Sequence, residues 1–213
     1  MSRVILQNKI SDELASFING DIAGITLPNN ITSIGDYAFA SLSSLTSVTI
    51  PDSVTDIGEG AFYRCLQLKN VNIPNGITVI KHSTFKYSNL ENINIPDTVT
   101  AFQQEAFYYC NISSINIPNG TRVIGIETFG GCGYLNNVVL PSSVTNIAYR
   151  AFEYCSRLNN LTIKAISPPT LDSTALNGTA SDLVIYVPSE SVETYKSASG
   201  WSAYSSRIQA IPA

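Results

Sequence analysis

Side chains that commonly carry out chemistry are sparse in this chain and show no catalytic spacing. The four cysteines Cys65, Cys110, Cys132 and Cys155 include no C-x-x-C pair, and His82 is the only histidine, so no zinc-ligand pattern is present. No G-x-S-x-G or cysteine–histidine signature and no glycine-rich phosphate loop occurs. We therefore predict no enzyme activity, no catalytic residues, no metal site and no cofactor.

The cysteines share one position, three residues after a phenylalanine. Leu42 and Ser88 occupy the same position in two other segments of the chain. A position that accepts cysteine, serine or leucine is typical of a small, inward-facing packing site, and free cysteine is among the most buried residue types. We therefore expect four buried, reduced thiols.

Composition narrows the class of partner. Only 13% of the residues are charged, about half the share usual in soluble proteins, whereas the chain contains 26 serines and 19 asparagines. A net charge of −4 argues against a nucleic-acid partner, which selects for basic surfaces. No apolar run approaches the roughly 18 residues of a membrane span, and the first nine residues do not form a signal peptide. We expect no nucleic-acid binding and no membrane insertion.

Two residue types recur with one shared, slightly irregular period of 23, 23, 22, 22 and 23 residues. The prolines are Pro28, Pro51, Pro74, Pro96, Pro118 and Pro141, and the phenylalanines are Phe39, Phe62, Phe85, Phe107, Phe129 and Phe152. Coils this short cannot bury their own apolar faces, but stacked coils bury a continuous core. The period therefore predicts six stacked units.

One unit, residues 45–65, shows how each coil is built. Residues 45–50 end in the period-two alternation of a short strand, and Pro51, which cannot donate to a strand ladder, should end it. Residues 54–57 favour a second, shorter extended segment. Ala61 and Phe62 then begin a compact turn.

These 21 residues, LTSVTIPDSVTDIGEGAFYRC, resemble the BspA-like type of leucine-rich repeat, whose pattern is approximately LxxLxIPxSVTxIGxxAFxxC. The resemblance covers residues 25–163, and residues 166–208 resemble the closing segment of many bacterial members. It implies an α/β repeat solenoid, a right-handed coil of short parallel strands with an irregular or short-helical convex side. It also implies secretion or cell-surface display, where some members act as adhesins.

Both ends of such a solenoid need covers. In residues 1–24, Ser11 is a candidate N-cap for a short helix that forms an N-terminal cap. Residues 25–163 hold the six repeats, and residues 164–213 form a C-terminal cap with a strand at 184–187 and a helix at 189–197.

Outward positions of the first strand stack into two columns of neutral, amide-rich side chains. We take these as candidate ligand-binding residues of the strand face: Ser47, Thr49, Asn70, Asn72, Asn92, Asn94, Ser114, Asn116, Asn137, Asn160 and Thr162. Two interpretations are open. Asparagine amides stacked along the sheet can hydrogen-bond to one another, or they can contact a glycan or a partner's backbone.

Tyrosines define a second candidate surface. They occupy the one or two positions after the repeat phenylalanine, and form a possible aromatic edge of Tyr63, Tyr87, Tyr108, Tyr109 and Tyr154. Tyrosine combines a rigid apolar ring with a polar tip and suits recognition surfaces, although partly buried turn residues would give the same pattern.

The sequence predicts a non-catalytic, monomeric protein- or glycan-binding or adhesion module that uses the strand face, and the resemblance implies that it belongs to a bacterial surface or secreted protein. The alternative is a structural or assembly module inside a cell or phage particle, because a reducing compartment keeps thiols reduced.

Overall fold

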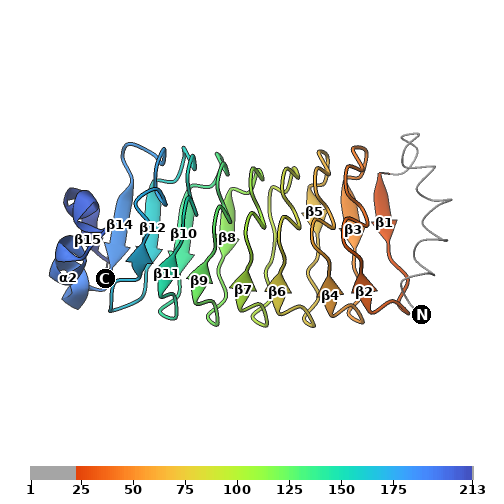
Figure 1. The fold of residues 1–213 in the computed structure, drawn as a ribbon, viewed down its shortest axis with the longest axis horizontal. Coiled ribbons are helices and arrows are strands. Elements are labelled where there is room, and N and C mark those ends of the chain that lie inside the picture. The colour runs from red at the N-terminus through yellow and green to blue at the C-terminus, as the bar shows by residue number, and fades with distance from the viewer. Residues whose placement is uncertain (1–22, 213) are drawn as a thin grey trace.

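The computed structural model describes residues 23–212, and these form one straight rod of stacked coils (Figure 1). We number coils 1 to 6 by their phenylalanines, Phe39 to Phe152. Each coil except coil 4 runs from a first strand through a proline turn to a second short strand, and then through a phenylalanine turn back to the next coil. In coil 4 the first strand is reduced to a single bridge between Asn92 and Ser114. The helix expected in the N-terminal cap lies outside the described residues.

The first strands stack in parallel along one side of the rod (Figure 1). They are β1 (Gly24–Thr26), β3 (Ser47–Thr49), β5 (Asn70–Val71), β8 (Ser114–Asn116), β10 (Asn137–Leu140), β12 (Asn160–Ile163) and β14 (Val184–Val187), followed by β15 (Ile208–Ala210). Equivalent residues pair, as Ser47 does with Asn70 and Asn137 with Asn160. The strands form two sheets, β1-β3-β5 and β8-β10-β12-β14-β15.

The second strands form another pair of parallel sheets, β2-β4 and β6-β7-β9-β11-β13. They are β2 (Ser33–Ile34), β4 (Asp56–Ile57), β6 (Val79–Ile80), β7 (Ala101–Phe102), β9 (Val123–Ile124), β11 (Asn146–Ile147) and β13 (Thr170–Leu171). Each proline lies between the first and second strand of its coil. Its carbonyl accepts a hydrogen bond from the N–H three residues later, as in Val54 to Pro51 (3.0 Å). The predicted role of proline in ending each first strand is confirmed.

At the phenylalanine turns a regular ladder of backbone hydrogen bonds joins each coil to the next, and we call it the turn ladder. All six phenylalanines donate their N–H to a carbonyl of the following coil, at 2.8 or 2.9 Å. The rings stack at centroid distances of 5.3 to 5.6 Å with interplanar angles of at most 15°. The stacked units predicted from the period are therefore confirmed.

The core is a continuous apolar column that extends from Leu27 to Ile208. All four cysteines are buried within it as free thiols, as their shared position predicts. Each cysteine Sγ donates a hydrogen bond to the carbonyl of the phenylalanine in the preceding coil, as Cys110 does to Phe85 (3.0 Å). Burial raises the pKa of the Cys110 thiol to about 12, so the group packs as a neutral side chain.

The segment after the six repeats first continues the coil pattern and then covers the end. β13 pairs with β11, and β14 pairs with β12. The 3-10 helix η1 (Ser189–Ser191), α2 (Val192–Ser197) and the 3-10 helix η2 (Ser202–Arg207) follow. The buried Tyr195 and Trp201 pack edge to face and donate to the carbonyls of Ala165 (2.8 Å) and Pro169 (2.7 Å). These two rings anchor the helical segment to the last coil.

Candidate binding surfaces

The strand face presents the predicted columns on one side of the rod. Their side chains alternate with buried residues such as Val48, Ile93 and Val138. Ser47, Asn160 and Thr162 are half-buried, and the other eight candidates are exposed. The parallel register therefore brings these polar groups together on an accessible surface.

Hydrogen bonding divides this face into engaged and unengaged parts. Asn72 accepts from the N–H of Ile50 and donates to its carbonyl, both at 2.7 Å, so its amide extends the strand ladder. Asn160 donates to Asn137 at 2.9 Å. Within residues 23–212, no side-chain hydrogen bond engages four of the central candidates, which are Asn92, Asn94, Ser114 and Asn116. Hydrogen bonding along the sheet thus accounts for Asn72 and Asn160 but not for these four residues.

A shallow depression of about 350 Å³ lies beside the beginning of the strand face. It is lined by Glu91, Asn92, Asn111, Ser113 and Tyr134. Of these five residues, only Asn92 was a sequence-based candidate. The other four lie one to three residues before a strand-face position. An inspection of the positions that precede the strand would have found them. The depression adds a carboxylate and an aromatic ring to the neutral amides.

An ion pair and a cation–π contact fix two of the side chains that line this depression. Lys69 forms an ion pair with Glu91 (2.7 Å), and the Arg157 guanidinium lies 4.6 Å from the centroid of the Tyr134 ring. The edge of the strand face is therefore built from side chains of several successive coils.

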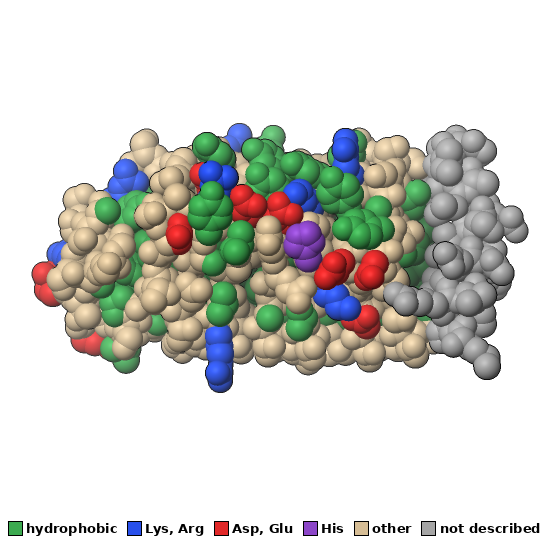
Figure 2. All heavy atoms as spheres, in the orientation of Figure 1, with side chains coloured by type: hydrophobic (Ala, Val, Ile, Leu, Met, Phe, Trp, Pro, Cys, Tyr) green, Lys and Arg blue, Asp and Glu red, His purple; other side chains and the backbone are tan. Residues whose placement is uncertain are grey.

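The tyrosines form a row along the phenylalanine turns. Centroid distances are 6.4 Å for Tyr37–Tyr63, 6.2 Å for Tyr63–Tyr87 and 5.6 Å for Tyr87–Tyr109, and Tyr108 packs edge-on at 4.7 Å from Tyr109. We call these five residues the tyrosine row. Figure 2 shows hydrophobic side chains gathered with charged ones on this face.

Two tyrosines depart from the predicted edge. Tyr154 is exposed but separate from the row, because coil 5 carries Gly130 and Gly131 at the equivalent positions. Tyr37 joins the row although it precedes its phenylalanine, and the sequence-based edge omitted it. Its position two residues before Phe39 was the available signal.

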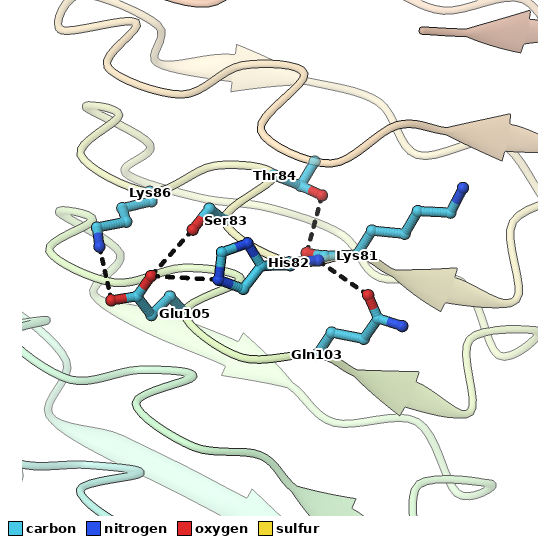
Figure 3. Close-up of polar contacts among 7 residues, drawn as sticks. All are labelled: Lys81, His82, Ser83, Thr84, Lys86, Gln103 and Glu105. Carbon is cyan, nitrogen blue, oxygen red and sulfur yellow. Dashed lines mark hydrogen bonds and ion pairs between the residues drawn. The ribbon is translucent and has the colours of Figure 1, made fainter. Parts of the chain in front are cut away.

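A polar cluster beside the row joins coils 3 and 4 (Figure 3). The Glu105 carboxylate contacts Lys86 Nζ (2.6 Å), accepts a hydrogen bond from Ser83 Oγ (3.0 Å) and lies 3.5 Å from His82 Nε2. Burial raises the pKa of Glu105, but the hydrogen bonds from Lys86 and Ser83 outweigh it and leave the pKa below its ordinary value.

This cluster has the wrong connectivity for nucleophilic catalysis. A nucleophilic serine needs a base that can take its proton, whereas the Glu105 carboxylate that accepts from Ser83 is paired with Lys86, which makes it a weaker base, and Ser83 itself is buried. Across residues 23–212 no group of three or more histidine, cysteine or acidic side chains is arranged to hold a metal ion. The cluster acts as an electrostatic link between two coils.

In the part of the chain that the structure covers, no helix has the length and apolar character to span a bilayer.

Stacked coils of short parallel strands around a leucine, isoleucine and phenylalanine interior define a leucine-rich-repeat solenoid. The family model described as "BspA type Leucine rich repeat region (6 copies)" matches residues 9–132 and 101–199. The chain therefore belongs to the BspA-type leucine-rich-repeat family, and the predicted family and solenoid fold are confirmed.

Solved structures of bacterial leucine-rich-repeat proteins are similar to this chain. A leucine-rich repeat protein from Bacteroides ovatus is 28% identical with a TM-score of 0.65, and the match covers 77% of this chain and 47% of that one. A leucine rich cell surface protein from Faecalibacterium prausnitzii is 20% identical with a TM-score of 0.52, covering 81% and 61%. The chain thus spans about half of the first and three fifths of the second. No curated protein matches it.

Proposed function

We propose that this chain is a non-catalytic binding or adhesion module of a bacterial surface or secreted protein, and that its strand face contacts a protein or glycan. Proteins of this repeat family generally serve as binding modules, which supports the class. The cell-surface description of the Faecalibacterium prausnitzii protein supports the location.

One observation carries the proposal. The central strand face exposes Asn92, Asn94, Ser114 and Asn116, whose side chains make no hydrogen bond within residues 23–212. Amides offer both a donor and an acceptor, and a face that carries them without net charge matches the hydroxyls of a glycan or the backbone of a protein. Because solvent already satisfies these groups, they can exchange water for a ligand without disturbing the fold.

The test is binding of the full chain to extracellular-matrix proteins and to a glycan array. The variant Asn94→Ala/Asn116→Ala removes two unengaged amides, whereas Asn75→Ala/Asn119→Ala removes two exposed amides from the proline turns and serves as a matched control. We expect binding that the first variant loses by at least about tenfold and the control retains. Equal binding by both variants, or no binding by the wild type, would overturn the proposal.

The alternative is a structural or assembly module inside a cell or phage particle. The observation in its favour is the set of four buried free thiols, which suit a reducing compartment. Fractionation of the native host with an antibody against the chain separates the two locations. Protein found only inside the cell or particle would favour the alternative.

A further inference from the structure

The tyrosine row is a second surface, built from different residues than the strand face. Tyr37, Tyr87 and Tyr109 are 54%, 36% and 45% exposed, whereas Tyr63 and Tyr108 are half-buried beneath them. The half-buried rings meet their neighbours edge-on, at 69° for Tyr63–Tyr87 and 78° for Tyr87–Tyr108. The exposed rings therefore pack against the half-buried ones.

The backbone beneath the row favours glycine. Arg64, Tyr87 and Tyr109 lie two residues after their phenylalanines with φ of 57°, 60° and 55°, in the left-handed region. The equivalent residue of coil 5 is Gly131, with φ of 72°. Glycine adopts this conformation freely, but other residues adopt it at a cost. Ser41 of coil 1 and Tyr154 of coil 6 have the same left-handed backbone, so this conformation belongs to the turn of every coil and does not single out the row.

A depression of about 380 Å³ opens beside the row, lined by Tyr63, Arg64, Leu66 and Tyr87. Leu66 is 49% exposed, which leaves an apolar wall in contact with water. Within residues 23–212 Arg64 has no ion-pair partner, whereas the neighbouring Lys86 is paired with Glu105. The Arg64 guanidinium, unpaired within the described part of the chain, thus lies at the edge of an apolar hollow.

The chemistry of this hollow indicates its occupant. Tyrosine and arginine are the residues that dominate protein–protein binding energy, and leucine supplies apolar area. A guanidinium binds a carboxylate through two parallel hydrogen bonds. Tyr37, Tyr63 and Tyr87 meet edge-on, at 80° and 69°, and so leave ridges and hollows around the depression rather than the flat platform on which a sugar ring stacks. The surface therefore suits side chains of a protein better than a polysaccharide.

We propose that the tyrosine row and its depression dock a segment of a partner protein in which a bulky apolar side chain stands next to an aspartate or glutamate. The apolar side chain fills the hollow between Tyr63, Leu66 and Tyr87, and the carboxylate pairs with Arg64. This site does not depend on the strand face.

The probes are short synthetic peptides that carry phenylalanine or leucine next to aspartate, and the same peptides with asparagine in its place. Binding to the full chain is followed by fluorescence anisotropy. Arg64→Gly removes the charge at a position where glycine fits the backbone. Ser41→Gly makes the same backbone change in the same column of coil 1, where φ is 63°, outside the depression, and is the matched control.

We expect aspartate peptides to bind the wild type and Ser41→Gly equally, and Arg64→Gly at least about tenfold more weakly. Asparagine peptides should lose a similar factor on the wild type and nothing further on Arg64→Gly. Tyr87→Gly should abolish binding, while Asn94→Ala/Asn116→Ala should leave it unchanged, which separates this site from the strand face.

Three outcomes would overturn the proposal. They are no peptide binding by the wild type at millimolar concentration, equal binding by Arg64→Gly, and glycan-array binding that Tyr87→Gly removes in the absence of any peptide binding.

Discussion

Neighbouring coils are joined differently at the phenylalanine turns and at the strands. The turn ladder continues through every step from Phe39 to Phe152, and the ring stack runs with it. Both strand columns are interrupted, the first between coils 3 and 4 and the second between coils 2 and 3. Within residues 23–212 the turns, and not the strands, give the solenoid its continuity.

Ion pairs cross both interruptions. Lys69 and Glu91 connect coils 3 and 4 beside the break in the first column (2.7 Å), and Lys81 and Asp56 connect coils 3 and 2 beside the break in the second (2.6 Å). Exposed ion pairs contribute little energy, so they cannot replace a strand ladder. The strand columns therefore tolerate irregularity because the turns hold the coils in register.

The largest expected effect comes from breaking the ring stack. Phe107→Ala removes a fully buried ring between two stacked neighbours and should lower the free energy of unfolding by about 3–5 kcal/mol. Val139→Ala on the exposed strand face should change it by no more than about 0.5 kcal/mol. Urea denaturation followed by circular dichroism measures both. Similar losses in the two variants would contradict the expectation that the ring stack stabilises the fold.

A backbone substitution at the turn should have the next largest effect. Gly131→Ala places a Cβ in the left-handed region and 2.6 Å from the Tyr109 ring, so we expect a loss of about 1–3 kcal/mol. Gly133→Ala meets nothing closer than 3.6 Å and should be nearly neutral. Thermal denaturation of the pair is the measurement, and equal melting temperatures would count against the strained turn.

A smaller, pH-dependent effect is expected at the charge cluster. The pKa of Glu105 is lower in the folded protein than in the unfolded chain, so its carboxylate stabilises the fold above the unfolded pKa of about 4.3, and this contribution disappears as the pH falls through the folded pKa. Glu105→Gln should cost about 1 kcal/mol at neutral pH. The difference from wild type should vanish in acid, as melting curves across this range would show. A constant difference would exclude the charge as its cause.

The smallest effect is expected for thiol reagents. Burial raises the pKa of Cys65, Cys110 and Cys155 to about 12, so almost no reactive thiolate exists at neutral pH in the folded chain. Iodoacetamide should therefore leave the native protein unmodified and label all four cysteines in urea. Mass spectrometry gives the count, and rapid labelling of the native chain would show that the turns open.

The sequence was sufficient for the architecture because the architecture is periodic. Pro51, Phe62 and their equivalents share one period, and this period was enough to predict which residues stack into columns. The strand expected at residues 184–187 coincides with β14. A residue that recurs at a fixed interval must meet its own equivalents in stacked coils, so no knowledge of individual contacts was needed.

The features that the sequence did not reveal depend on contacts between particular side chains. Nothing in the local sequence of Asn72 distinguishes an amide that bonds to Ile50 from the unengaged amides of Asn94 and Asn116. Left-handed backbone at Arg64 and Tyr87 was equally hidden, because glycine is the residue that normally signals it. The candidate surfaces could thus be located by column, but not divided into structural and available residues.

The turn ladder has a consequence for how such proteins change in length. Each phenylalanine N–H meets the same kind of acceptor in the next coil, at nearly the same distance, wherever along the rod it stands. A duplicated or deleted coil would find matching partners on either side and would leave the rest of the rod undisturbed. We therefore expect that duplication or loss of one coil changes the length of the rod while the turn hydrogen bonds on either side are kept.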